Sequence, residues 1–200
     1  MKKIIPFILI IIIIATSYEG SVLAKGKNGL KIYVKKQSRS EQAYDNILVT
    51  EVVSGDIIRL ENGELIRLIG VDTPELNRGV KFDADVKITG LQSEVLEVMA
   101  KESWLFLKDL VLDKNIRVEF DKKRKDLYGV LLGYVFIIQE FKKRGDPRKE
   151  EVFVNAECIK NGYTYNVDNQ PNDYYKDLFD RLHQEVGLNS KGIWKQWQQQ

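Results

Sequence analysis

Three short apolar runs separated by turn residues open the central part of the chain. They are rich in β-branched side chains and lie at residues 47–53, 57–60 and 65–71. Ser54-Gly55-Asp56 interrupts the first run, and Asn62-Gly63, a dipeptide typical of tight hairpins, separates the second from the third. The pattern predicts three antiparallel strands in meander order that end at Asp72.

Helical periodicity follows, and then two more strands. Between residues 91 and 112 apolar side chains recur at spacings of three, four and seven, which predicts an amphipathic helix. Residues 116–120 alternate as a strand, and residues 128–138 indicate a long strand. Residues 76–90 are mixed, and residues 139–151 are charged. We expect a surface loop in the first segment and a solvated loop or hairpin tip in the second.

Two further helices are predicted towards the C-terminus. The first covers residues 155–161 and ends at Gly162, a typical C-cap residue. The second begins after Asn172 or Asp173 and ends at Gly187. Its apolar stripe consists of Tyr175, Leu178, Phe179, Leu182 and Val186.

This order of elements predicts the fold class. Five strands with a helix between the third and the fourth is the order of the OB-fold, a small Greek-key barrel. We therefore expect a mixed β/α protein: a five-stranded OB-fold Greek-key β-barrel with three α-helices, covering residues 47–195. A polar leader with one short strand would precede it at residues 25–46, and a polar tail would follow at residues 196–200.

The N-terminus has the pattern of a signal peptide. Lys2 and Lys3 precede an apolar run from Ile4 to Ala15, and Val22-Leu23-Ala24 fits a cleavage site. The run is shorter than the ~20 apolar residues that a membrane span needs. We predict a signal peptide at residues 1–24 and a secreted or periplasmic protein. The alternative is an uncut segment that tethers a structural envelope protein to the membrane.

Composition and charge narrow the function only slightly. Hydrophobic residues make up 44% and charged residues 30%, as in ordinary soluble domains. Cleavage after Ala24 removes two lysines and one glutamate, which changes 31 basic and 29 acidic residues to 29 and 28. Polyanion binding must therefore depend on local patches. Cys158 is the single cysteine, and we expect a buried thiol there.

Two aspartates lie where predicted strands meet turns. Asp56 ends the turn after the first strand, and Asp72 follows the third strand. The hairpin predicted between them can bring both aspartates to the same rim of a barrel. Two carboxylates and a backbone carbonyl suit Ca²⁺, which takes six to eight oxygen ligands, whereas no His or Cys cluster suggests zinc. The alternative is that both aspartates are turn residues bonded to their own backbone.

An arginine and a glutamate flank the second aspartate. Arg67 lies in a strand otherwise rich in Ile and Leu, so it needs a partner or an anion, and a guanidinium matches phosphate oxygens. Glu75 follows Pro74 and could orient or deprotonate a water. The alternative is a structural ion pair of Arg67 with Glu75 or Asp72.

These residues belong to a larger set that resembles the staphylococcal nuclease family in order and spacing. The matching stretches are Ser54-Gly55-Asp56, Arg67-Leu68-Ile69-Gly70-Val71-Asp72-Thr73-Pro74-Glu75, Asp126-Leu127-Tyr128-Gly129, Val154-Asn155 with Gly162, and Ile193-Trp194. The resemblance implies an OB-fold and Ca²⁺-dependent cleavage of DNA and RNA phosphodiesters.

The resemblance also implies a role for each matching position. Asp56 and Asp72 would bind the metal together with the carbonyl of Thr73. Glu75 would handle the attacking water, and Arg67 would bind the phosphate. Tyr128 would line the nucleotide pocket.

The chain departs from the family pattern at several substrate-facing positions. Family members usually carry a second arginine directly after the Tyr-Gly pair, where this chain has Val130. A phosphoryl-transfer arginine can be worth roughly 10³ to 10⁵ in rate. Arg124 and Lys125 lie one turn away and are candidate substitutes, although a basic turn is more often a solvated tip.

Two functions follow from this set. The first is a secreted Ca²⁺-dependent endonuclease that acts on DNA and RNA as a monomer, weakened by Val130, with no membrane span after cleavage. The second is a catalytically impaired OB-fold module that binds nucleic acid or protein. The metal pair and the water-handling acid favour the enzyme, whereas Val130 favours the binding module.

Overall fold

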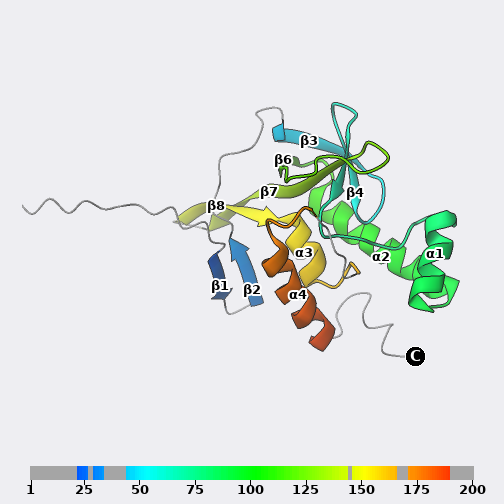
Figure 1. Ribbon diagram of the computed structural model, residues 1–200. Helices are drawn as coiled ribbons and strands as arrows, with labels where there is room; N and C mark the ends of the chain where they lie inside the picture. The colour runs from blue at the N-terminus through cyan, green and yellow to red at the C-terminus, as the bar shows by residue number, and fades with distance from the viewer. Residues whose placement is uncertain (1–21, 27–28, 34–43, 144–145, 166–170, 190–200) are drawn as a thin grey trace, which may run out of the picture.

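A closed five-stranded β-barrel forms the centre of the protein. The computed structural model describes residues 22–26, 29–33, 44–143, 146–165 and 171–189. The barrel strands are β3 (Asp45–Val52), β4 (Ile57–Leu60), β5 (Leu65–Leu68), β6 (Asn115–Glu119) and β7 (Leu131–Lys143). Figure 1 labels all of them except β5. They pair in the order β5-β4-β3-β6-β7, and a parallel pairing of β5 with β7 closes the ring. The predicted OB-type barrel is confirmed.

Two strand pairs extend beyond the ring. β8 (Asp146–Phe153) pairs antiparallel with β7, so the charged segment predicted as a loop or hairpin tip forms a long hairpin. β1 (Val22–Gly26) and β2 (Gly29–Tyr33) form a separate hairpin where one short strand was expected. β1 includes the predicted cleavage position at Ala24. Residues 1–21 and 190–200, which hold the apolar N-terminal run and the C-terminal tail, lie outside the described residues.

Four helices, rather than the three predicted, occur in the described part of the chain. α2 (Ser93–Val111), α3 (Val154–Lys160) and α4 (Lys176–Asn189) correspond to the predicted helices. α1 (Val80–Thr89) lies in the segment predicted as a loop. Its Val80 and Ile88 are exposed and only Phe82 contributes a buried apolar side chain, so no hydrophobic stripe indicated the helix.

The apolar core fills the barrel and continues under α2, α3 and α4. Buried side chains of every barrel strand join those of α3, Leu107 and Val111 of α2, and Leu178 and Phe179 of α4 in one cluster. The predicted stripe of α4 is buried as expected. Cys158 is also buried in this core, which confirms the expected buried thiol, and burial raises the pKa of the thiol.

A glycine shapes the turn after β5 that leads towards Asp72. Gly70 has φ of +80°, a left-handed conformation that favours glycine. An added Cβ would also overlap the ring of Phe179 on α4. The chain can therefore leave the barrel at this point only because position 70 has no side chain.

A buried asparagine fixes the same strand end from the other side. The Nδ2 group of Asn155 donates to the carbonyls of Ile69 at 2.8 Å and Gly133 at 3.1 Å, and its Oδ1 accepts from the Val135 backbone at 2.8 Å. Asn155 thus connects α3 to β7 and to the turn that precedes Asp72.

Replacing Asn155 with alanine is expected to destabilise the protein by about 3 kcal/mol, because the Val135 N–H and the Ile69 carbonyl lose this partner and the Gly133 carbonyl keeps only the Ile69 N–H. Urea denaturation monitored by circular dichroism measures the change. Asn115→Ala removes an exposed amide that donates to Asn46 and should change stability by less than about 0.5 kcal/mol. Equal effects of the two substitutions would contradict this role of Asn155.

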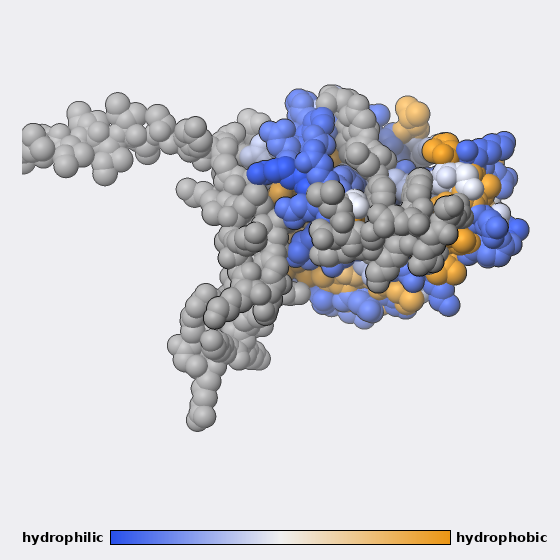
Figure 2. All heavy atoms as spheres, turned by 90° about the horizontal axis from the view of Figure 1, so that it is seen from below, coloured by the Kyte–Doolittle hydropathy of each residue, from blue (hydrophilic) through white to orange (hydrophobic). Residues whose placement is uncertain are grey.

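None of the helices in the described segments is long and apolar enough to cross a bilayer. Figure 2 shows a face of the molecule where hydrophilic residues are interspersed with small apolar groups.

Candidate active site

Asp56 is buried at the start of β4, where it is held by two donors. Ser54 donates from Oγ to Asp56 Oδ1 at 2.6 Å, and Arg67 donates from Nη1 to Asp56 Oδ2 at 3.0 Å. The Asp56 residue is only 3% exposed. Burial raises the pKa of this carboxyl to about 6, although Arg67 and Ser54 act in the opposite direction.

Arg67 lies on β5 between two carboxylates. Besides Asp56, its Nε lies 3.3 Å from Oδ2 of Asp126. The parallel register of β5 with β7 places Arg67 opposite Leu132, next to the loop that carries Asp126. The sequence left open a structural ion pair of Arg67 with Glu75 or Asp72. Those partners were wrong, because Arg67 pairs with Asp56 and Asp126 instead. Only Nη1 makes a hydrogen bond within the described residues; Nε is buried without one, and Nη2 has no acceptor either.

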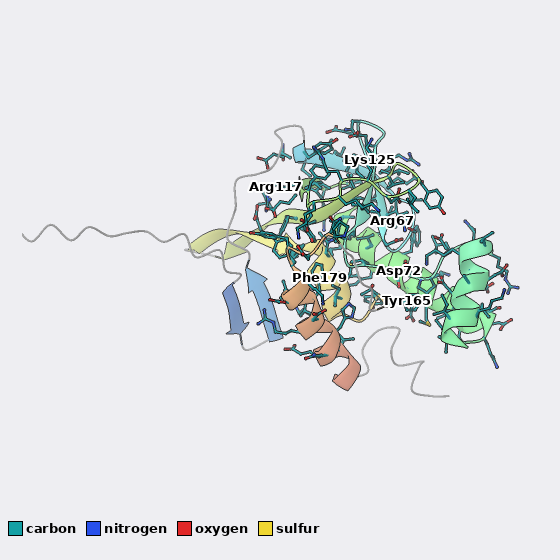
Figure 3. The ribbon with its side chains drawn as sticks, in the orientation of Figure 1. Arg67, Asp72, Arg117, Lys125, Tyr165 and Phe179 are labelled. Carbon is teal, nitrogen blue, oxygen red and sulfur yellow. The ribbon has the colours of Figure 1, made fainter. Side chains whose placement is uncertain are left out.

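Asp72 and Thr73 continue from the same strand end. The segment after α3 holds the Asp72 backbone in place: the hydroxyl of Thr164 accepts from the Asp72 N–H at 2.8 Å and donates to the Asp72 carbonyl at 3.0 Å. Figure 3 shows Asp72 and Arg67 on the side of the barrel that faces α1. Thr73 is buried, and its Oγ1 has no hydrogen-bond partner within the described segments.

The turn before Asp56 packs directly on Thr73. A Cβ added to Gly55 would lie 2.8 Å from Thr73 Oγ1 and 2.7 Å from the Cβ of Ser103, so only glycine permits this approach. The structure therefore brings the two aspartate-bearing loops into contact at one rim. Their charges influence each other, since Asp72 raises the pKa of Asp56.

A lysine of α1 points into this rim. Nζ of Lys81 lies 2.8 Å from the carbonyl oxygen of Thr73, 3.2 Å from Oδ1 of Asp72 and 3.1 Å from Oδ2 of Asp85. Burial alone would lower the pKa of the Lys81 ammonium, but Asp72 and Asp85 outweigh it and raise the pKa. The predicted metal donors Asp72 and Thr73 thus converge on a positive charge.

Glu75 lies one residue beyond the stiff Thr73-Pro74 segment. Burial raises the pKa of the Asp85 carboxyl, and the backbone N–H of Glu75 acts to lower it. Lys81 joins the loop to α1 through the Thr73 carbonyl. The Glu75 side chain is half-buried and has no ion-pair partner in the described part of the chain. A carboxylate without an ion-pair partner, two residues after Thr73, is available to accept a proton.

The loop beside Arg67 carries Tyr128. Asp126 Oδ1 accepts from the backbone N–H groups of Tyr128 and Val130, both at 2.9 Å, and so fixes the turn that faces Arg67. Tyr128 is 88% exposed and can stack against a base.

The two candidate substitutes for the second arginine lie just before this turn. The Arg124 guanidinium lies 4.3 Å above the ring of Phe120, and Lys125 is exposed with its backbone bridged to Leu131.

Comparison with known proteins identifies the family. Residues 65–196, more than half of the chain, match the family model for staphylococcal nuclease homologues. The chain belongs to the staphylococcal nuclease family. It is similar to the thermonucleases of Staphylococcus intermedius, with 31% identity over 80% of this chain and 82% of that protein, and of Staphylococcus hyicus, with 28% over 78% and 77%. An uncharacterized protein of Methanocaldococcus jannaschii is 30% identical over 73% of this chain and 70% of its own length.

Membership of the staphylococcal nuclease family supports a nuclease function. The matched span includes Arg67, Asp72 and Glu75. Asp56 lies before this span, and its place in the site follows from two contacts, Arg67 with Asp56 and Thr73 with Gly55.

In this conformation the predicted ligands Asp56, Asp72 and Thr73 fit a hard cation only in part. Asp72 and the Thr73 carbonyl already share a cationic partner, whereas Asp56 is bonded to Arg67 and Ser54. Consistent with this, no cluster of three or more His, Cys, Asp or Glu side chains forms a metal site within the described segments. The oxygen-only chemistry of Asp56, Asp72 and Thr73 suits Ca²⁺ rather than zinc.

Proposed function

We propose that the protein is a secreted Ca²⁺-dependent phosphodiesterase that cleaves DNA and RNA endonucleolytically. The observation that carries the proposal is the contact between the Asp56 turn and the Asp72–Thr73 loop beside Arg67. A pure binding module has no physical need for paired acidic loops, a phosphate-matching guanidinium and an unpaired glutamate at one rim.

Asp56, Asp72 and the Thr73 carbonyl would hold the Ca²⁺. When bound, such an ion polarises a phosphate oxygen and favours hydroxide formation from a coordinated water. Asp56 must then be ionised and turned at least partly away from Arg67, which frees the guanidinium for substrate.

Three other side chains would act on the substrate itself. Arg67 would bind the non-bridging phosphate oxygens through Nη2 and through the donors that Asp56 now engages, and this stabilises developing negative charge. Glu75 would orient the attacking water and accept its proton. Tyr128 would stack on a base next to the scissile phosphate.

Val130, which occupies the position of the second family arginine, weakens the proposed catalysis. Val130 supplies no guanidinium, and its backbone N–H is bonded to Asp126. Arg124 and Lys125 are the nearest basic residues along the chain, and we propose them as phosphate contacts. If neither substitutes, the alternative function is a catalytically impaired OB-fold module that binds nucleic acid or protein.

Cleavage of single-stranded DNA distinguishes these functions. The purified protein is incubated with labelled DNA in Ca²⁺, in Mg²⁺ and in chelator, and the products are separated by size. We expect internal cleavage in Ca²⁺ that stops in chelator, and the same with RNA. Binding without cleavage under every condition, even at high protein concentration, would leave only the binding module.

The raised pKa of Asp56 predicts a pH dependence of metal binding. Below about pH 6 this carboxyl is protonated and must lose its proton before it can bind a cation. Ca²⁺ affinity measured by calorimetry should be constant above pH 7 and should fall by up to about tenfold per pH unit below 6. An affinity that stays constant down to pH 5 would show that Asp56 does not bind the ion.

The proposed export is supported by the N-terminal charge and apolar run alone. Mass spectrometry of the exported protein should give a mass that corresponds to cleavage near Ala24. A full-length mass in the membrane fraction would favour the tethered alternative. We also propose that the exported protein acts as a monomer.

A further inference from the structure

Lys81 occupies the position towards which two proposed calcium ligands point. The Thr73 carbonyl and the Asp72 carboxylate are the oxygens that this rim would offer to an ion, and both contact the ammonium of Lys81 at 2.8 and 3.2 Å. An ammonium group and Ca²⁺ cannot share the same oxygens, because two cations would lie within a few ångströms of each other.

Asp85 gives the ammonium a third oxygen partner. It lies one helical turn after Lys81 on α1, its Oδ2 is 3.1 Å from Nζ, and it is only 7% exposed. Its Oδ2 and the Thr73 carbonyl share the Lys81 ammonium, so the Asp85 carboxylate lies beside the loop that carries Asp72 and Thr73. Because Asp85 is buried, its carboxylate has less freedom to leave the rim than the Lys81 ammonium has.

The two residues differ in their freedom to move. The Lys81 side chain is 34% exposed and flexible, so its ammonium can turn into solvent without disturbing α1. The departure of the ammonium would leave three oxygens, from Asp72, Thr73 and Asp85, around the position it held. This is an all-oxygen set of the kind that Ca²⁺ prefers.

We propose that Lys81 is an internal cation that occupies the calcium position in the metal-free protein, that Ca²⁺ displaces it, and that Asp85 then becomes an additional ligand. The inference rests on the proposed metal site and specifies how that site is filled. In the metal-free state the ammonium compensates the charge of Asp72 and Asp85 and, with Arg67, that of Asp56. The wild-type protein therefore binds Ca²⁺ more weakly than its ligand set alone would allow.

Calcium titration of matched variants tests the exchange. Lys81→Met should bind Ca²⁺ about tenfold more tightly than the wild type, since no internal cation competes. Asp85→Asn should bind about tenfold more weakly, because an ionised ligand is lost. Lys87→Met and Asp83→Asn make the same charge changes at exposed positions of α1 and should change affinity less than twofold. Calorimetry reports these affinities without any need for cleavage.

The outcomes separate this inference from the proposed function. Equal calcium affinities of Lys81→Met and Lys87→Met would overturn the exchange, while a loss of affinity in Asp72→Asn would still support the metal site. Binding that no rim substitution alters would overturn both. Cleavage in chelator by the wild type but not by Lys81→Met would also overturn the exchange, because the lysine would then replace the metal.

Amine labelling of the wild-type protein tests the same exchange without a substitution that could impair folding. An acylating reagent is applied with and without Ca²⁺, and modification of each lysine is quantified by peptide mass spectrometry. Labelling of Lys81 should rise severalfold with Ca²⁺, whereas labelling of Lys87 should not change. A fall or no change at Lys81 at saturating Ca²⁺ would contradict its displacement.

Discussion

Arg67→Ala is expected to lower the turnover of DNA cleavage by about 10³- to 10⁵-fold, the range found for arginines that stabilise phosphoryl transfer. The guanidinium lies beside Asp56 and is the charged donor that β5 presents at the rim. Because the second family position holds Val130, no arginine at that position can compensate the loss. Single-turnover cleavage at saturating Ca²⁺ measures the effect. Arg67→Lys should recover little, since an ammonium cannot bind two phosphate oxygens as a fork does.

Arg59→Ala is the matched control for this experiment. Arg59 lies on the neighbouring strand β4 and is paired with Glu51 at 2.6 Å on the exposed surface. Its loss should change turnover less than twofold and stability by less than about 1 kcal/mol. Comparable losses of turnover in the two variants, or retention of activity in Arg67→Ala, would contradict a role of Arg67 in catalysis.

Glu75→Gln is expected to lower turnover by about 10²- to 10⁴-fold while leaving DNA affinity within a few fold of the wild type. The amide keeps the shape of the side chain but cannot accept a proton from water. The bond from Lys81 to the Thr73 carbonyl is unaffected, so the loop should stay in place. Cleavage rate and DNA binding are measured on the same preparation, the second in chelator.

Glu94→Gln provides the comparison, because Glu94 is exposed in the first turn of α2 and should tolerate the change without effect. A Glu75→Gln variant that cleaves at the wild-type rate would remove Glu75 from the proposed chemistry. A variant that loses DNA affinity and turnover together would instead assign the residue to substrate binding.

The barrel was predictable because its signals are local. Alternating β-branched runs and the Asn62-Gly63 turn determine the first three strands, and the stripes of α2 and α4 follow helical periodicity. α1 was missed for the same reason, since it lacks an apolar stripe. Its contacts with the rim are ionic and its Phe82 packs in a small separate cluster.

The site was predictable only where its residues lie near one another in sequence. Asp56, Arg67, Asp72 and Glu75 are separated by a hairpin and a turn, so strand order was enough to suggest a common rim. Asp126 reaches Arg67 only because β5 and β7 pair in parallel to close the barrel. No pattern in the sequence indicates that pairing. Lys81 and Asp85 belong to the helix that was not predicted; their i,i+4 spacing was the one available signal.

The location of bound calcium tests the central claim most directly. Crystals of the protein grown with Ca²⁺ are measured at a wavelength that gives anomalous signal from calcium. We expect one ion at about 2.3–2.6 Å from carboxylate oxygens of Asp56 and Asp72 and from the Thr73 carbonyl, with Arg67 and Glu75 facing it. Calcium that is absent from this rim at saturating concentration, with Arg67 still bonded to Asp56, would contradict the proposed catalytic site.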